Sequence, residues 1–345
     1  MTNATAAPSR ELPKTLARVP MRVGPALAAA SATLSPELRR IVEYHWGWLD
    51  ASGAAVRSRS GKLLRPALAL LSAEAVGEPA ERALAAAVAV ELIDDLTRRH
   101  DDVMDGDRER RGRPTAWAVF GIGPALCAGD ALVPLAQRVL LADESAARVA
   151  ALRALGEATA TVIAGQALDL AFEGRCDLGS DEYLRMAGMK TGALLGCAAS
   201  IGALLVGGPV ESVDALARFG RSLGLSFQAI DDWLGIWGDP RRTGKPVASD
   251  LRQRKASLPI VVAAGDAGAA GDELRALLAG REPLSERELA RGLACLNTTG
   301  AEAHTLAFAD RQLDCALQSL DGIALNPLAG EVLRELARFV VARDA

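Results

Sequence analysis

The chain has 345 residues, of which half are apolar and 4% aromatic, and its formal net charge is −4. This length fits one large domain or two ordinary ones, and the scarcity of alternating, aromatic-rich segments favours an all-helical fold. The acidic balance, without a basic stripe of interleaved aromatics, argues against nucleic-acid binding. Five cysteines are scattered singly and lack the spacing of a zinc site or a disulfide framework. We therefore expect a cytoplasmic protein.

The chain opens with a tail and a helix. Residues 1–20 are rich in Ala, Pro, Ser and Thr, have no apolar run typical of a signal peptide, and are expected to be disordered. Residues 21–345 are expected to form one domain, with a first helix over residues 25–49. Lys62 and Arg65 then fall at a predicted helix start, where backbone N–H groups also favour anions. This is a weak signal for an anion site.

A carboxylate motif lies at the end of an apolar helix that begins near residue 83. The sequence HDDVMD carries Asp101, Asp102 and Asp105. On a helix, Asp101 and Asp105 lie one turn apart on one face, with Asp102 beside them. Carboxylates this close repel one another unless cations lie among them. Their hard oxygen atoms suit Mg²⁺, which takes the rest of its shell from water and substrate phosphates.

A basic segment follows this helix directly. It contains Arg108, Arg110, Arg111 and Arg113 after Gly106. Guanidinium groups bind phosphate in bidentate fashion, so the segment is suited to a phosphorylated substrate. Taken alone, the stretch is also consistent with a solvated acidic helix end followed by a basic loop.

Further apolar helices are predicted over residues 124–141, 144–172, 183–206 and 212–237. Lys190 and Thr191 lie near the start of the third. Residues 191–210 carry no charge and are long enough to span a bilayer, but they contain five glycines. Such a composition favours a buried helix with closely packed neighbours, so we expect a soluble protein without a membrane span.

A second carboxylate pair, Asp231 and Asp232, ends the last of these helices, about 130 residues after the first motif. Two such groups facing each other across a helical bundle would form a multinuclear Mg²⁺ site for a diphosphate. The lysines support this interpretation, because four of only five lysines fall in the motifs: Lys62, Lys190, Lys245 and Lys255. Lysine is a compact point charge suited to phosphate oxygens.

In combination, these motifs resemble those of the trans-isoprenyl diphosphate synthases, or polyprenyl synthetases, from about residue 39 to the C-terminus. The resemblance implies an all-α, single-domain isoprenoid synthase fold, the class I terpenoid synthase bundle around a central cavity. It also implies a homodimeric trans-prenyltransferase that condenses an allylic diphosphate with isopentenyl diphosphate to a short-chain product of C10 to C20.

The resemblance also implies roles for individual residues. The ligands of three Mg²⁺ ions would be Asp101, Asp102, Asp105, Asp231 and Asp232. The allylic diphosphate would be held by Arg110, Lys190, Lys245 and Lys255, and Thr191 and Gln228 would also bind substrate. Isopentenyl diphosphate would be held by Lys62, Arg65 and Arg111. Leu96 and Thr97 occupy the positions that limit the depth of the product cavity, and neither is a bulky aromatic that would close it at the shortest product.

The chain departs from the family pattern at three places. Gly235 stands where the fullest pattern has a third aspartate, Asp94 where a histidine is usual, and Arg98-Arg99 where two apolar residues are usual. Arg98 lies one helical turn from both Asp94 and Asp102. It can therefore neutralise Asp94 or compete with Mg²⁺ for Asp102. In a third arrangement, both arginines point outward.

These departures leave three functions open. The first is the prenyltransferase. The second is a terpene-synthase-like lyase that ionises an allylic diphosphate without isopentenyl diphosphate, and the third is a non-catalytic partner subunit or cargo. Asp94 and Gly235 favour the lyase, whereas Lys62, Arg65 and Arg111 favour the prenyltransferase. The intact first motif argues against a non-catalytic subunit.

Overall fold

The computed structural model describes residues 14–56, 63–143, 145–243, 246–280 and 283–341. Its first half contains α1 (Lys14–Ser31), α2 (Pro36–His45), α3 (Leu64–Ala75), the 3₁₀ turn η1 (Ala80–Ala83), α4 (Leu84–Met104), the strands β1 (Glu109–Arg110) and β2 (Arg113–Pro114), α5 (Ala116–Phe120), α6 (Ile122–Asp130), α7 (Leu132–Leu140) and α8 (Ala146–Phe172). Its second half contains α9 (Ser180–Ala187), the π-helical turn η2 (Gly188–Gly192), α10 (Ala193–Leu205), α11 (Val210–Trp237), α12 (Pro240–Thr243), α13 (Ser249–Arg252), α14 (Leu258–Ala264), α15 (Ala269–Leu278), α16 (Glu286–Thr298), α17 (Ala301–Gln318) and α18 (Pro327–Val341).

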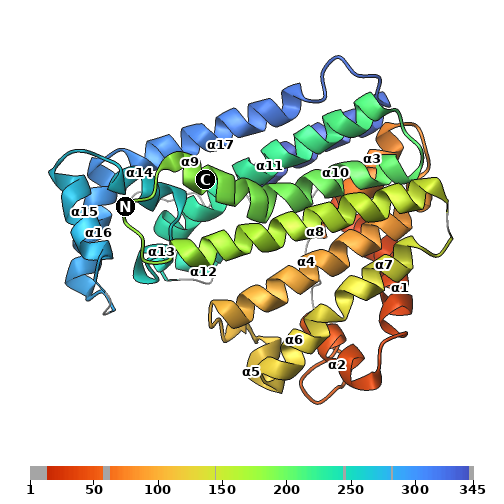
Figure 1. The fold of residues 1–345 in the computed structure, drawn as a ribbon, viewed down its shortest axis with the longest axis horizontal. Coiled ribbons are helices and arrows are strands. Elements are labelled where there is room, and N and C mark those ends of the chain that lie inside the picture. The colour runs from red at the N-terminus through yellow and green to blue at the C-terminus, as the bar shows by residue number, and fades with distance from the viewer. Residues whose placement is uncertain (1–13, 57–62, 144, 244–245, 281–282, 342–345) are drawn as a thin grey trace, which may run out of the picture.

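The predicted all-α fold is confirmed. The long helices α4, α8, α10, α11 and α17 lie side by side along the longest axis of the molecule, each in contact with the next (Figure 1). In the described residues, the strands form one two-stranded antiparallel hairpin, with Glu109 opposite Pro114 and Arg110 opposite Arg113. The other helices cover the sides and ends of this row.

Glycines let α10 approach its neighbours closely. A Cβ at Gly202 would lie 1.9 Å from the carbonyl oxygen of Ala69 on α3, and a Cβ at Gly220 on α11 would lie 2.3 Å from that of Leu195. The continuous run Ser180–Leu205 is long and apolar enough to cross a membrane, but 72% of its most apolar window is buried among the other helices. The expected buried helix is thus confirmed.

The predicted start of the domain is wrong in detail. Helix α1 begins at Lys14 and contains Pro20 and Pro25, so residues 14–20 of the expected disordered tail are helical. Residues 1–13 lie outside the described residues. The helix predicted over residues 25–49 is two helices, because Ser35 accepts a hydrogen bond from the Leu38 N–H and starts α2 as an N-cap followed by proline.

The helix predicted over residues 124–141 is also divided, into α6 and α7, which meet at Ala131. Helices α6 and α7 both pack against α4. Apolar periodicity alone does not reveal a change of direction between two helices that pack on the same neighbour. The predicted helices over residues 144–172 and 212–237 correspond closely to α8 and α11.

Candidate active site

A glycine turn ends α4 and leads into the basic hairpin. Gly106 has φ +67°, and the Asp107 N–H donates to the Asp102 carbonyl at 3.0 Å, which is a left-handed helix cap. Arg111, with φ +55°, lies in the turn between β1 and β2. A non-glycine residue in this conformation is uncommon and is found preferentially at functional sites. The hairpin places Arg110 beside the end of α4.

The three aspartates of the first motif are divided between two faces of α4. Asp105 accepts a hydrogen bond from Nζ of Lys255 at 2.8 Å. Asp101 is part of the same charge cluster, in which burial raises the pKa of Asp101 to about 6 while Lys190 opposes the rise. Asp102 instead accepts from Nε of Arg110 at 2.6 Å. The structure therefore groups Asp101 with Asp105 but directs Asp102 to a different side.

Lys190 is presented by the π-helical turn η2. Its Nζ lies 2.5 Å from Oδ2 of Asp169 on α8. Burial lowers the pKa of Lys190, but Asp169 and Asp101 raise it by more, so the amine stays protonated. The backbone of η2 can approach α8 closely because residue 165 is glycine. A Cβ at this position would lie only 2.4 Å from the backbone nitrogen of Lys190. Single π turns inside helices are common at functional sites.

The second motif contains one buried and one exposed carboxylate. Asp232 is buried and accepts hydrogen bonds from the Tyr183 hydroxyl, from the Leu258 N–H at 2.7 Å and from Nε2 of Gln228 at 2.8 Å. Burial raises the pKa of Asp232 to about 7 against these bonds. Asp231 is exposed. Of the two, Asp231 is the more accessible to a metal ion.

Thr191 and Gln228, both predicted to bind substrate, are in direct contact. Oγ1 of Thr191 donates to Oε1 of Gln228 at 2.6 Å. Gln228 in turn donates to Asp232, so this chain of bonds connects η2 to the second motif on α11. The residues next to Lys190 are thereby held against the helix that carries Asp231.

The carboxylate of Asp250 lies beside Gly235, where the fullest family pattern has a third aspartate. A Cβ at Gly235 would lie 2.2 Å from Oδ2 of Asp250, so the carboxylate of α13 occupies the space in front of this glycine. Asp250 also raises the pKa of Asp232. Asp250, Asp169 and Tyr183 are site residues that no sequence motif predicts, because their closeness to the motifs arises only in the tertiary structure.

Asp101 and Asp105 fit a Mg²⁺ ion that takes its other ligands from water and substrate phosphates. Among the residues that the structure describes, no three His, Cys, Asp or Glu side chains are already gathered as a metal site. Mg²⁺ is usually bound by one or two carboxylates together with water and substrate phosphates, and not by an all-protein cage. Asp101 and Asp105 provide such a pair, with Lys190 and Lys255 balancing their charge.

The atypical residues before the first motif are paired with one another. Arg98 contacts Asp94 at 3.0 Å and Glu91 at 3.1 Å, and Asp94 also contacts Arg65 of α3 at 2.7 Å. Of the arrangements that the sequence left open, the structure has the one in which Arg98 neutralises Asp94. The other acceptor, Asp102, is paired with Arg110 instead.

The neighbouring arginine is buried. Arg99 forms an ion pair with Asp95, one turn earlier on α4, at 2.5 Å, and Nε2 of His45 lies 3.2 Å from the same carboxylate. Only 1% of Arg99 is exposed, so the arrangement in which both arginines point outward is wrong. Burial lowers the pKa of His45 to about 3 despite the opposing effect of Asp95, so this imidazole is neutral.

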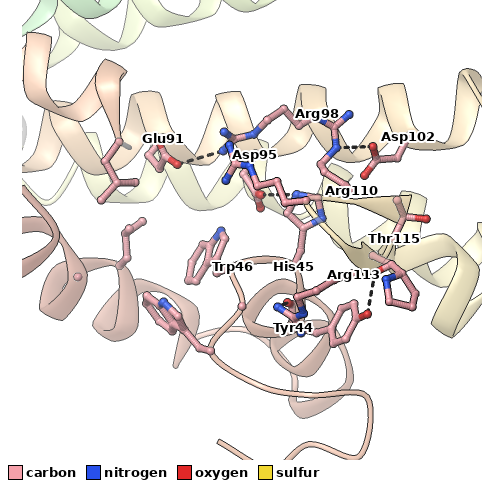
Figure 2. Close-up of a pocket in the computed structure, with 18 of the residues that line it drawn as sticks. Tyr44, His45, Trp46, Glu91, Asp95, Arg98, Asp102, Arg110, Arg113 and Thr115 are labelled. Atoms are coloured by element: carbon pink, nitrogen blue, oxygen red, sulfur yellow. Dashed lines mark hydrogen bonds and ion pairs between the residues drawn. The ribbon is translucent and has the colours of Figure 1, made fainter. Parts of the chain in front are cut away.

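A cavity of about 360 Å³ lies between α4, the end of α2 and the basic hairpin. Glu91, Asp95, Arg98 and Asp102 project toward it from α4, with His45 and Trp46 on the opposite side (Figure 2). Arg110 and Arg111 also line it. Arg111, predicted to bind isopentenyl diphosphate, thus lies close to Arg98.

The remaining predicted residues are only partly placed. Leu96 is buried next to Gly129 of α6, and Oγ1 of Thr97 donates to the Asp94 carbonyl at 2.9 Å. Lys62 and Lys245 lie outside the described residues.

Comparison with known proteins gives a consistent result. Residues 47–296 match the family described as polyprenyl synthetase. The chain is 43% identical over 326 residues to a (2E,6E)-farnesyl diphosphate synthase of Mycobacterium tuberculosis, covering 94% of this chain and 91% of the relative. It is 40% identical over 306 residues to a geranylgeranyl diphosphate synthase of the same organism, covering 88% and 87%. The crystal structure of a polyprenyl synthetase from Streptomyces coelicolor superposes with a TM-score of 0.91 at 42% identity, covering 96% of this chain and all of the other.

Proposed function

Because the chain belongs to the polyprenyl synthetase family, we propose that Asp101, Asp105 and Asp231 hold Mg²⁺ around the diphosphate of an allylic substrate. The chain is a trans-prenyltransferase that makes a short-chain trans-prenyl diphosphate, in keeping with its farnesyl and geranylgeranyl diphosphate synthase relatives. These relatives do not favour the lyase or the partner subunit.

The observation that carries this proposal is the meeting of Asp101 and Asp105 with Lys190 and Lys255 at the end of α4. Bound Mg²⁺, three ions by the family resemblance, supplies positive charge that stabilises the departing diphosphate. A diphosphate brings the additional oxygen ligands that the protein itself does not provide.

The lysines stabilise the same charge. Burial lowers the pKa of Lys255, but the hydrogen bond to Asp105 and the nearby carboxylates together raise it by more, so both Lys190 and Lys255 are cationic at neutral pH. Fixed positive charges at this place stabilise the negative charge that grows on the diphosphate as its bond to the allylic carbon breaks. The isopentenyl double bond then attacks that carbon, and the proton that is lost passes to the released diphosphate.

The second substrate is assigned to the other side of α4. Arg65 and Arg111 lie around Asp94, Glu91 and Arg98 there. A diphosphate held by these guanidinium groups is anchored separately from the allylic diphosphate. Two anchored substrates on one helix give the orientation that a bimolecular condensation needs.

The test is a product assay with Mg²⁺ and C5, C10, C15 or C20 allylic diphosphates, each with and without isopentenyl diphosphate. We expect prenyl diphosphates longer than the starter, and only when isopentenyl diphosphate is present. Hydrocarbon or alcohol formed without isopentenyl diphosphate would support the lyase instead. Absence of product in every reaction would support the partner subunit.

We further propose a cytoplasmic homodimer. All five cysteines are free, which suits a reducing compartment. Light scattering of the purified protein should give a mass of twice 36.0 kDa. A mass of 36.0 kDa at micromolar concentration would exclude the homodimer.

A further inference from the structure

The cations expected to hold isopentenyl diphosphate share their counterions with Arg98. Asp94 lies 2.7 Å from Arg65 and 3.0 Å from Arg98, which also contacts Glu91 at 3.1 Å. Burial lowers the pKa of Arg111, and Arg98 and Arg110 lower it further. Arg98 is therefore the centre of the charge cluster that includes two of the predicted isopentenyl diphosphate ligands.

The cluster has a surplus of positive charge only when Arg98 is counted. Glu91 and Asp94 are 5% and 3% exposed, so water screens them little. Arg65, Arg98 and Arg111 outnumber these two carboxylates by one positive charge. Without Arg98 the surplus disappears, and two buried carboxylates remain beside a substrate that is itself strongly anionic.

Two hydrogen-bond donors in the cluster have no acceptor among the described residues. The Nε atoms of Arg65 and Arg98 are buried and have no hydrogen-bond partner within the described residues. Buried donors of this kind are rare in folded proteins unless a water or a ligand satisfies them. Arg98 also lines the cavity next to Arg111 and keeps about a quarter of its side chain exposed, at 25%.

We propose that Arg98 is a positioning residue of the isopentenyl diphosphate subsite. Its guanidinium neutralises Asp94 and Glu91, so that Arg65 and Arg111 keep the positive potential that the second diphosphate requires. The inference rests on the proposed function, because it names how one subsite of that enzyme works. It also accounts for the joint presence of Asp94 and Arg98, since Asp94 would weaken the subsite if Arg98 did not neutralise it.

The test compares Arg98→Leu, Arg98→Lys and the double variant Asp94→Asn/Arg98→Leu with the wild-type enzyme. Arg98→Leu should raise the KM for isopentenyl diphosphate about tenfold, because the buried carboxylates of Glu91 and Asp94 lose the cation that they share. The KM for the allylic diphosphate and kcat should stay within about twofold, since the Asp101 side of α4 is unchanged. Arg98→Lys should restore the KM for isopentenyl diphosphate to within about threefold, because it keeps a cation beside both carboxylates. The double variant should recover part of the loss, because it removes the Asp94 charge while Glu91 stays without Arg98.

Arg334→Leu is the matched control. The Arg334 side chain on α18 is 26% exposed, about as much as that of Arg98, and it forms an ion pair with Asp321. Its KM values should equal those of the wild type. An unchanged KM for isopentenyl diphosphate in Arg98→Leu would overturn the inference, as would two KM values that rise together or a double variant that shows no recovery.

Should Arg98→Leu not fold, Asp94→Asn tests the same idea in reverse. This variant retains Arg98 and removes a negative charge, so it should lower the KM for isopentenyl diphosphate; an unchanged or higher KM would overturn the inference. A wild-type enzyme without any elongated product would contradict the proposed function itself, whereas an active wild type with an insensitive Arg98 contradicts only this inference.

Discussion

The contact between α8 and η2 at Gly165 offers a direct test of how the fold positions Lys190. In Gly165→Ala the new Cβ would lie 2.4 Å from the Lys190 nitrogen and 2.8 Å from its Cα. An ordinary contact begins at 3.4 Å, so the turn must move by 1.0 Å. Overpacking against backbone costs about 1–3 kcal/mol. A displacement of about 1 Å in a positioned group can lower the rate about 10²-fold.

The measurements are kcat at saturating substrates and the free energy of unfolding in denaturant. Gly156→Ala on the same helix is the matched control, because nothing lies within 4 Å of the added Cβ. It should keep the wild-type kcat and gain up to about 1 kcal/mol from helix propensity. If Gly165→Ala behaved like this control in both measurements, the role given to the close contact would be refuted.

Three further predictions concern the two motifs and the buried histidine. Gly235→Asp, which restores the fullest family pattern, should lower the free energy of unfolding by about 1–3 kcal/mol, because its Cβ would overlap the Asp250 carboxylate; an equally stable variant in denaturant melts would contradict this. Asp101→Ala should lower kcat about 10²–10³-fold even at saturating Mg²⁺, and a kcat within tenfold of wild type would exclude Asp101 as a metal ligand. His45 has a folded pKa of about 3 against an ordinary 6.5, so the unfolded state binds more protons between these values, and stability is complete above about pH 6.5 and falls as pH falls. Wild type should lose about 1.4 kcal/mol more than His45→Asn between pH 7.5 and 5.5, and equal losses in denaturant melts would refute the buried neutral imidazole.

Helical periodicity predicts the residues that act within one helix, and much of the site is of this kind. The spacing of Asp101 and Asp105 places them on one face of α4, where the structure has them. The same geometry turns Asp102 away by about 100°, and its partner Arg110 confirms the different face. Arg98 had two acceptors at helical spacing, and each of them has a further partner outside α4, Arg65 for Asp94 and Arg110 for Asp102.

Contacts between side chains on different helices could not be predicted from the sequence. Asp169 next to Lys190 and Asp250 next to Gly235 join segments that no local pattern relates. Their burial and partners depend on the packing of α8, α11 and α13.

The start of α1 carries an apolar helical pattern that the sequence prediction did not use. The many Ala, Pro, Ser and Thr residues over 1–20 suggested a disordered tail, and proline usually interrupts a helix. Yet the buried residues Leu16, Val19, Val23 and Leu27 recur at helical spacing and form one apolar face. Burial of that face against α3 and α4 stabilises the helix despite its prolines.

The central claim is that the two diphosphates bind on different sides of α4. The most direct test measures initial rates for Lys255→Gln and Arg111→Gln while the concentrations of both substrates are varied. Lys255→Gln should raise the KM for the allylic diphosphate about tenfold and leave that for isopentenyl diphosphate within about twofold, and Arg111→Gln should do the reverse. If both KM values rose together in either variant, the two diphosphates would share one site, and the assignment of one substrate to each side of α4 would be wrong.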